Sequence, residues 1–322
     1  MKRIIIAGIN GFLGRHLATH LQQKGYAVEG LTRNPDTTDC CDNIPVHRWN
    51  GRTLGPWATR INGAHAVINL CGQSVNCRYT PQNKELILKS RIESTCVLGL
   101  AIKLCPRPPE AWLNASTATI YRDARDHGMT EQDGEIGTGF SVDIATAWEN
   151  ALFEEPLRKT RRVVLRTSLV LGHGNNSALP VLTKLARLGL GGPIADGNQM
   201  FSWIHVDDFT RAVAFLLGEE DIEGPVNITA PAPLTNRDFM QQLRKTIRIP
   251  FGLPTPKPLL YLGAWLLRTE PELPLKSRWI IPEKLTQHRF LWNYPFLDEA
   301  LTNLLNTATT NPTSTAMLHT LA

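Results

Sequence analysis

The chain has 322 residues, of which 42% are hydrophobic and 20% are charged, an ordinary composition for a globular protein that buries a substantial core. Its formal net charge is +5 and the basic residues are spread along the chain, so we expect neither nucleic acid nor a membrane surface as a partner. Because the apolar stretch near the N-terminus is short and glycines interrupt it, it fits neither a signal peptide nor a membrane span, and we expect a cytoplasmic protein.

Short apolar runs alternate with longer amphipathic stretches up to about residue 230, which is typical of the βα units of a parallel sheet. Strands are predicted over residues 3–7, 27–32, 66–70, 111–115, 162–168 and 226–229. Helices long enough to cross over the sheet are predicted over residues 12–24, 81–104, 144–157 and 207–217. This order predicts an α/β fold with a doubly wound parallel sheet, the Rossmann fold.

From Pro231 the chain changes to short helical stretches that prolines interrupt. We expect an NADP(H)-binding Rossmann domain over residues 1–230, with substrate-side insertions at about 175–205, and a small, mostly helical substrate-side domain over residues 231–305. Residues 306–322 are small and polar without a hydrophobic period, which predicts a flexible tail. The six cysteines show no CxxC pair and no histidine at metal-ligand spacing, so we expect free thiols and no metal site.

The strongest functional signal is the glycine-rich turn between the first predicted strand and the first predicted helix. Its glycines allow a tight turn, a close approach of backbone amides to a diphosphate, and close packing of helix on strand. The N-terminus of the helix then favours the anion. The same spacing also occurs in ordinary loops, but the strand before it and the helix after it favour a dinucleotide. The predicted cofactor-binding residues of this turn are Gly8, Asn10, Gly11, Phe12, Leu13 and Gly14.

Arg33 follows the second predicted strand. The segment Leu31-Thr32-Arg33-Asn34 contains no carboxylate to hold a ribose 2′-hydroxyl, and an arginine there can pair with a 2′-phosphate. We therefore predict NADP(H) in preference to NAD(H). The alternative is a solvated surface arginine.

Several segments resemble the atypical short-chain dehydrogenase/reductases of the epimerase-like type, within the NAD-dependent epimerase/dehydratase superfamily. Besides the glycine turn, they lie at residues 66–72, 78–80, 90–92, 114–116, 148–149, 189–193, 202–208, 226–231 and 282–285, so the resemblance covers nearly the whole chain. It implies an extended-type Rossmann domain, an NADP(H) site and a small C-terminal domain over the substrate cleft. It implies no particular reaction.

The chain departs from related patterns at two places. Sugar-nucleotide epimerases of similar fold carry a Tyr-x-x-x-Lys pair, and alignment on Trp148-Glu149 puts Ser141 and Ala145 at those positions. Neither can exchange a proton as the tyrosine does or hold the nicotinamide ribose as the lysine does, although the wider atypical family also lacks the pair. Residues 114–122 read Asn-Ala-Ser-Thr-Ala-Thr-Ile-Tyr-Arg, where relatives look like Asn-Ala-Ser-Ala-Val-Gly-Tyr-Tyr-Gly, which predicts a different substrate.

Three residues after the strand at 111–115 are candidates for catalysis. Ser116 and Thr117 are predicted at the carboxyl edge of the sheet, where their hydroxyls either bind a substrate carbonyl or imine or bond local backbone. Tyr121 is the first candidate for a proton donor, provided that a cation activates its phenol. The alternative is a buried structural tyrosine.

Further candidates lie at and after the strand predicted over residues 66–70, and His205 lies before the helix predicted over residues 207–217. Asn69, Leu70, Gly72 and Arg91 are predicted to face the cofactor. Arg78, Lys84 and His205 are tentative substrate residues. Lys84 and Arg91 are seven residues apart on one helix and could equally form a solvated stripe. His205 is either an acid or base near neutral pH or a buried hinge, with Asp207 or Asp208 as the N-cap of the following helix.

Three functions fit these signals. The first is an NADP(H)-dependent oxidoreductase that reduces a small carbonyl, imine or conjugated alkene substrate. The second is a non-catalytic binding protein in which bound NADP(H) biases a partner surface. The third keeps sugar-nucleotide epimerase chemistry, with Thr117 and Tyr121 replacing the missing pair, and ranks last because nothing replaces the lysine. A homodimer is compatible with each.

Overall fold

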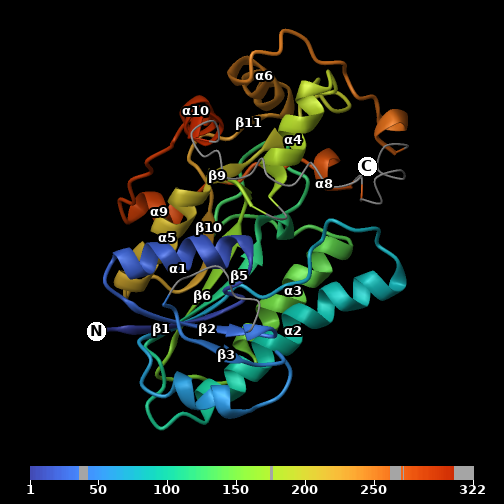
Figure 1. The fold of residues 1–322 in the computed structure, drawn as a ribbon. Coiled ribbons are helices and arrows are strands. Elements are labelled where there is room, and N and C mark those ends of the chain that lie inside the picture. Colours follow the sequence, from blue (N-terminus) through green and yellow to red (C-terminus); the bar gives the residue numbers. More distant parts are fainter. Residues whose placement is uncertain (36–42, 175–176, 262–269, 271, 308–322) are drawn as a thin grey trace, which may run out of the picture.

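A computed structural model describes residues 1–35, 43–174, 177–261, 270 and 272–307. Its central feature is a seven-stranded sheet with helices on both faces (Figure 1). All neighbouring strands in this sheet are parallel. In spatial order the strands are β10 (Gly224–Ile228), β6 (Arg161–Thr167), β5 (Ala111–Thr117), β4 (Ala66–Asn69), β1 (Arg3–Ala7), β2 (Ala27–Thr32) and β3 (Val46–Arg48).

The central strand β1 shows why the sheet is parallel and covered on both faces. Ile4, Ile5 and Ile6 are all fully buried, as expected for a strand with a hydrophobic layer on each side. One layer comes from α1 (Phe12–Gln23) and α5 (Val206–Gly218), which contact each other. The other comes from α2 (Pro81–Lys103) and α3 (Phe140–Phe153), which lie side by side on the opposite face (Figure 1).

The structure confirms the predicted doubly wound α/β fold. Each predicted strand and each predicted crossover helix is present, with small differences at the ends. The largest difference is at α3, which begins at Phe140, four residues before the predicted start. Strand β3 and a 3₁₀ helix at Pro56–Ile61 are additional elements that the sequence did not predict.

A smaller layer of short elements stands above the carboxyl ends of the sheet (Figure 1). Two strand pairs belong to it: β7 (Leu169–Leu171) with β9 (Trp203–His205), and β8 (Met200–Phe201) with β11 (Leu234–Thr235). Its helices are α4 (Ala178–Arg187), α6 (Asn236–Thr246), α8 (Glu272–Leu275) and α10 (Leu297–Thr307). Helix α9 (Glu283–Gln287) instead contacts β10 of the main sheet. Helix α6 contacts both α4 and α10, so segments far apart in the chain pack together here.

This layer has a hydrophobic core of its own. Leu179 and Trp203, from the predicted insertion, share one buried cluster with Phe239 and Leu301 from the predicted C-terminal domain. Between α8 and α10 the chain returns to the main sheet, because Leu285 of α9 is buried in the cluster that contains β1. The domain boundaries stay a prediction. Helix α10 extends to residue 307, and the remainder of the predicted tail lies outside the described residues.

Membrane spans and metal-binding groups are absent from the part of the chain that the structure describes. None of its helices is both long and apolar enough to cross a membrane. It contains no group of three or more His, Cys, Asp or Glu side chains arranged to hold a metal ion. Cys71, Cys77, Cys96 and Cys105 are free thiols.

Candidate cofactor and substrate site

The turn between β1 and α1 leaves no space for side chains at two of its glycines. Gly8 has φ +84°, and a Cβ there would lie 3.0 Å from the Leu70 carbonyl carbon. A Cβ on Gly14 would overlap the Gly8 carbonyl oxygen. The Gly11 amide donates to that same oxygen at 3.0 Å. The turn is therefore tight, and α1 begins directly against the end of β1.

The first turn of α1 offers unused backbone donors. Gly11 is the N-cap, and no side chain caps the helix there. The amides of Phe12, Leu13 and Gly14 have no partner within the helix, because the first intrahelical bond runs from the Arg15 amide to the Gly11 carbonyl. Uncapped amides at a helix N-terminus favour an anion, so this turn fits a dinucleotide diphosphate.

The side chains of Phe12 and Leu13 serve packing. Phe12 fills the space beside Gly172 and Gly174, where a Cβ on Gly172 would lie 2.7 Å from the Phe12 ring. Leu13 packs against the buried cluster between the sheet and α1.

Asn10 connects the glycine turn to the end of β2. Its side-chain amide donates to the Thr32 hydroxyl at 3.0 Å, and the same hydroxyl accepts from the Asn34 amide at 3.3 Å. Arg33 is exposed between them. Burial raises the pKa of the Cys71 thiol to about 12, and the positive charge of Arg33 opposes this rise. Arg33 itself follows the carboxyl end of β2, the strand next to β1 in the sheet.

Asn69 shapes the loop that leaves β4. It is fully buried. Its side-chain Nδ2 donates to the Asn114 side chain at 2.8 Å, and its side-chain Oδ1 accepts from the Cys71 backbone amide at 3.1 Å. The Leu70 amide donates to the Ala7 carbonyl at 2.9 Å, which continues the pairing of β4 with β1. Asn69 and Leu70 thus position the exposed Gly72 beside the glycine turn.

Arg91, on α2, contacts this loop through its guanidinium. Its guanidinium donates to the carbonyls of Gln73 at 3.1 Å and Ile87 at 2.9 Å, and a Cβ on Gly72 would lie 3.2 Å from its Cζ. The guanidinium also lies 5.0 Å from the centroid of the Trp148 ring. Burial lowers the pKa of Arg91 to about 10.

Lys84 and Arg91 both face α3. The Lys84 ammonium lies 4.7 Å from the Phe140 ring centroid, and Arg91 makes the corresponding contact with Trp148 eight residues later. These contacts align α2 with α3 and favour a packing role over a solvated stripe. Arg78 is exposed in the preceding loop, where its carbonyl accepts from the Asn83 side chain at 2.7 Å.

The predicted catalytic residues Ser116 and Tyr121 belong to one polar network at the carboxyl ends of β5, β6 and β10. Arg166 and Glu149 form its centre, a two-bonded ion pair with distances of 2.9 and 2.7 Å. The Ser116 hydroxyl donates to Glu149 at 2.7 Å. Arg166 donates to the Tyr121 hydroxyl at 2.9 Å, and that hydroxyl donates to the Asn227 side chain at 2.9 Å.

This network uses the hydroxyls that the sequence offered for catalysis. Tyr121 is only 2% exposed, and burial raises its pKa even though Arg166 opposes the rise. Thr117 bonds locally, since its hydroxyl donates to the Thr119 hydroxyl and accepts from the Thr119 amide. A catalytic role for these residues stays a prediction, and for Tyr121 the geometry favours the structural alternative.

His205 is a buried hinge between β9 and α5. It is 1% exposed, and its ring stacks on Tyr294 at 4.0 Å between centroids. Nδ1 accepts from the Asp207 amide at 3.0 Å, so His205 itself caps α5 and the predicted aspartate cap is wrong. Asp208 instead accepts from the Tyr294 amide at 2.8 Å. Burial lowers the pKa of His205, which leaves the ring neutral.

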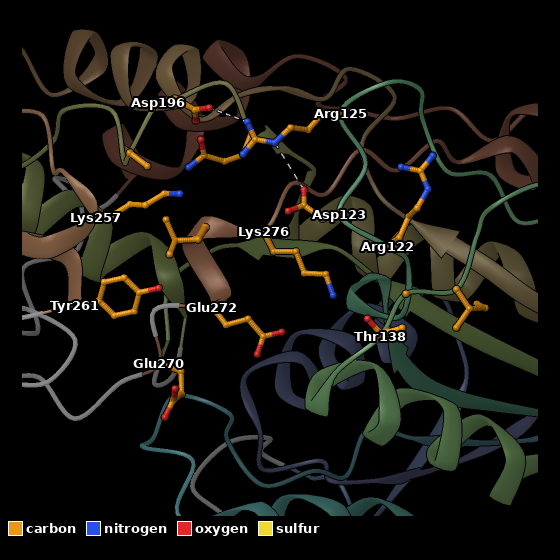
Figure 2. Close-up of a pocket in the computed structure, with 15 residues that line it drawn as sticks. Arg122, Asp123, Arg125, Thr138, Asp196, Lys257, Tyr261, Glu270, Glu272 and Lys276 are labelled. Carbon is orange, nitrogen blue, oxygen red and sulfur yellow. Dashed lines mark hydrogen bonds and ion pairs between the residues drawn. The ribbon is translucent and has the colours of Figure 1, made fainter.

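A cavity of about 750 Å³ lies between the loop after β5 and the C-terminal segment (Figure 2). Arg122 and Thr138 line it from the loop side, and Lys257 and Tyr261 lie across the cavity from them. The predicted substrate residues Arg78, Lys84 and His205 are not among the residues that line it. Arg122, which departs from the related pattern, does line it.

The cavity wall carries charges of both signs. Arg125 pairs with Asp196 at 2.8 Å (Figure 2), and Arg122 pairs with Asp126 at 2.8 Å. Burial lowers the pKa of Lys276 on the same wall. These groups can orient a polar small molecule.

Tyr79 connects the cavity to α3 and was not predicted as a site residue. Its ring contacts the Phe140 ring at 4.9 Å between centroids, and burial raises the pKa of its phenol. Its amide donates to the Glu270 carboxylate at 2.6 Å, and Glu270 lines the cavity. Ala145, at the other position of the absent pair, is fully buried against the core.

Comparison with known proteins decides the family. The chain matches the model of the NAD dependent epimerase/dehydratase family over residues 4–229. It belongs to this family. An epimerase family protein of Staphylococcus epidermidis, SERP0438, is 30% identical over 95% of this chain and 99% of its own length.

Solved structures of the family agree with the fold. The crystal structure of the human epimerase family protein SDR39U1 (isoform 2) with NADPH has a TM-score of 0.83 and 27% identity, and the match covers 94% of this chain and 99% of that chain. A nucleoside-diphosphate sugar epimerase from Corynebacterium glutamicum has a TM-score of 0.76 and 26% identity, over 95% of this chain and 58% of that chain. The resemblance to epimerase-like short-chain dehydrogenase/reductases is thus confirmed.

The residues that sequence reasoning missed are mainly those that bind side chains from distant segments. Arg166 directly follows the buried apolar run Val163-Val164-Leu165 within the same strand, and a charge inside a buried strand is a signal for a buried partner. Glu149 is that partner. Tyr79 and Glu270 are 191 residues apart, and no local pattern connects them.

Proposed function

We propose that this chain binds NADP(H) and uses it to reduce a small carbonyl, imine or conjugated alkene compound. The observation that carries the proposal is the uncapped helix start behind a turn without space for side chains. It lies beside the point where the order of strands reverses, because β2 and β4 lie on opposite sides of β1. Ligands of doubly wound sheets bind at this reversal.

The chain's own residues fit the cofactor. The amides of Phe12, Leu13 and Gly14 would hold the diphosphate, and Arg33 would pair with the 2′-phosphate. Gly72 would border the nicotinamide half. Family membership and the NADPH in the human SDR39U1 crystal support this assignment.

The reduction needs a hydride, which the nicotinamide supplies when bound. The chain would contribute orientation and a proton, and the cavity would hold the substrate. Its volume of about 750 Å³ suits a small organic molecule. The protein would act in the cytoplasm, as a monomer or a homodimer.

A fluorescence titration of the purified chain with NADPH and NADH tests the cofactor assignment. We expect NADPH to bind at least about tenfold more tightly than NADH, because charge-assisted bonds to the 2′-phosphate contribute about 1.5–3 kcal/mol. Equal affinities would remove the role of Arg33. Turnover is then sought with NADPH and panels of aldehydes, ketones, imines and enones, and its absence across all classes would count against the reductase.

The second candidate is a non-catalytic sensor of the NADP(H) redox state. The observation that favours it is the absence of a Tyr-x-x-x-Lys pair on α3, where Ala145 is buried and cannot hold a ribose. A sensor predicts unequal affinity for a partner protein between the NADP⁺ and NADPH complexes. The same buried alanine argues against sugar-nucleotide epimerase chemistry.

A further inference from the structure

Arg15, in the first turn of α1, folds back onto the glycine turn. Its guanidinium Nε donates to the Asn10 carbonyl at 3.0 Å. The residue is exposed, and its two terminal nitrogens, Nη1 and Nη2, form no hydrogen bond or ion pair with any of the described residues. A positive charge with unused donors therefore lies against the turn.

Asn10 connects this guanidinium to the end of β2. Its side-chain amide donates to the hydroxyl of Thr32, the last residue of β2, and that hydroxyl also accepts from the Asn34 amide. Thr32 is buried, whereas Arg33, directly after it, is exposed. A chain of two hydrogen bonds, through Asn10 and Thr32, thus runs from Arg15 to the strand end that carries Arg33.

The surroundings of the two arginines suit a doubly charged anion. Neither the turn at residues 8–14 nor the segment at residues 31–35 contains a carboxylate. Arg33, like Arg15, forms no ion pair within the part of the chain that the structure describes. A phosphate monoester carries a charge of about −1.5 to −2 near neutral pH, which one guanidinium does not neutralise.

The position of the adenosine ribose follows from the fold. In a doubly wound sheet the ribose 2′-oxygen lies at the end of the second strand, beside the glycine turn. Here that place is bordered by Thr32 and Arg33 on the strand side and by Asn10 on the turn side. A phosphate on the 2′-oxygen would therefore meet Arg33 from β2 and the terminal nitrogens of Arg15 from α1.

We propose that Arg15 is a second determinant of the preference for NADP(H), and that Arg15 and Arg33 together bind the adenosine 2′-phosphate. This inference rests on the proposed function. Asn10 and Thr32 act as positioning residues that hold the two guanidinium groups near each other. NADH has a hydroxyl in place of this phosphate, so neither charge-assisted contact forms with it.

The competing explanation is that Arg15 only supports the turn through its bond to Asn10. A weakened turn would hold the diphosphate less well, and NADPH and NADH share the diphosphate. Loss of Arg15 would then weaken both dinucleotides equally, whereas loss of a contact to the 2′-phosphate weakens NADPH alone. The ratio of the two dissociation constants separates these explanations.

The test measures both dissociation constants by fluorescence titration for the wild type, Arg15→Gln, Arg15→Lys and the control Lys24→Gln. Lys24 is an exposed cation at the other end of α1, so its substitution removes the same charge away from the turn. We expect Arg15→Gln to lower NADPH affinity about tenfold and to change NADH affinity by less than about twofold. Arg15→Lys should recover part of the loss, because the charge remains while the planar fork is lost. Lys24→Gln should keep both affinities within about twofold of wild type.

A second measurement isolates the phosphate contact from the nicotinamide half. Adenosine 2′,5′-bisphosphate is titrated as a competitor of bound NADPH, and adenosine 5′-monophosphate is the counterpart without the 2′-phosphate. Arg15→Gln should weaken the bisphosphate about tenfold and leave the monophosphate unchanged. The double variant Arg15→Gln with Arg33→Ala should bind both compounds with nearly equal affinity.

Two results would overturn the inference: equal losses of NADPH and NADH affinity in Arg15→Gln, or NADPH affinity that stays at the wild-type level in that variant. Failure of the wild type to bind either dinucleotide would overturn the proposed function, and this inference with it.

Discussion

The glycine turn after β1 and the polar network behind β5 and β6 lie at the same edge of the sheet, yet they are built in opposite ways. At the turn, side chains are absent and amides of α1 are left without partners. In the network, Ser116, Glu149, Arg166, Tyr121 and Asn227 bond to one another. Polar residue types at a functional edge therefore do not mark the ligand site by themselves, whereas unsatisfied donors do.

The largest expected effect concerns the polar network around Arg166. Arg166→Met leaves the Glu149 carboxylate buried without its cation, and removing one partner of a buried ion pair costs about 3–5 kcal/mol. Urea unfolding should show this loss, and the double variant Arg166→Met with Glu149→Leu should recover part of it. A single variant as stable as the wild type would show that the pair is not a structural centre.

The next largest effect concerns the glycine turn after β1. Gly14→Ala places a Cβ on the Gly8 carbonyl oxygen, so the turn must shift. Overpacking of this kind costs about 1–3 kcal/mol, and if this cost falls on the bound state, NADPH affinity should fall by about 5- to 150-fold. The matched control is Gly218→Ala at the end of α5, where a Cβ meets nothing within 4 Å. Unchanged NADPH binding in Gly14→Ala would contradict a dinucleotide site at this turn.

Arg33→Ala sharpens the comparison, because it alters specificity without altering the turn. NADPH affinity should fall by about 10- to 100-fold while NADH affinity changes little, as expected when a charge-assisted pair to a phosphate is lost. Arg158→Ala removes an exposed arginine that precedes β6, at the amino end of that strand, and serves as the control. Equal losses for both dinucleotides would mean that Arg33 acts on the protein and not on the 2′-phosphate.

The smallest effect concerns Tyr121. Tyr121→Phe removes the donor to Asn227 and one acceptor of Arg166, which should lower the free energy of unfolding by about 1–2 kcal/mol. Turnover per folded molecule should stay at the wild-type level. A large drop in kcat with little change in stability would return Tyr121 to the mechanism.

The sheet was predictable because its strands are buried on both faces and therefore show continuous apolar runs. The start of α3 was harder to predict, because its N-cap is Gly139, at φ +102°, with no capping side chain. The glycine turn could be recognised from its spacing together with the strand before it and the helix after it. The pairing of Tyr121 with Asn227 could not, since these residues are 106 positions apart and meet only when β6 and β10 align in register.

A crystal structure of the chain with NADPH is the most direct measurement of the central claim. We predict that the diphosphate lies on the amides of Phe12, Leu13 and Gly14 and that the 2′-phosphate contacts the Arg33 guanidinium. A dinucleotide bound away from this turn, or crystals that take up none at saturating NADPH, would contradict the account.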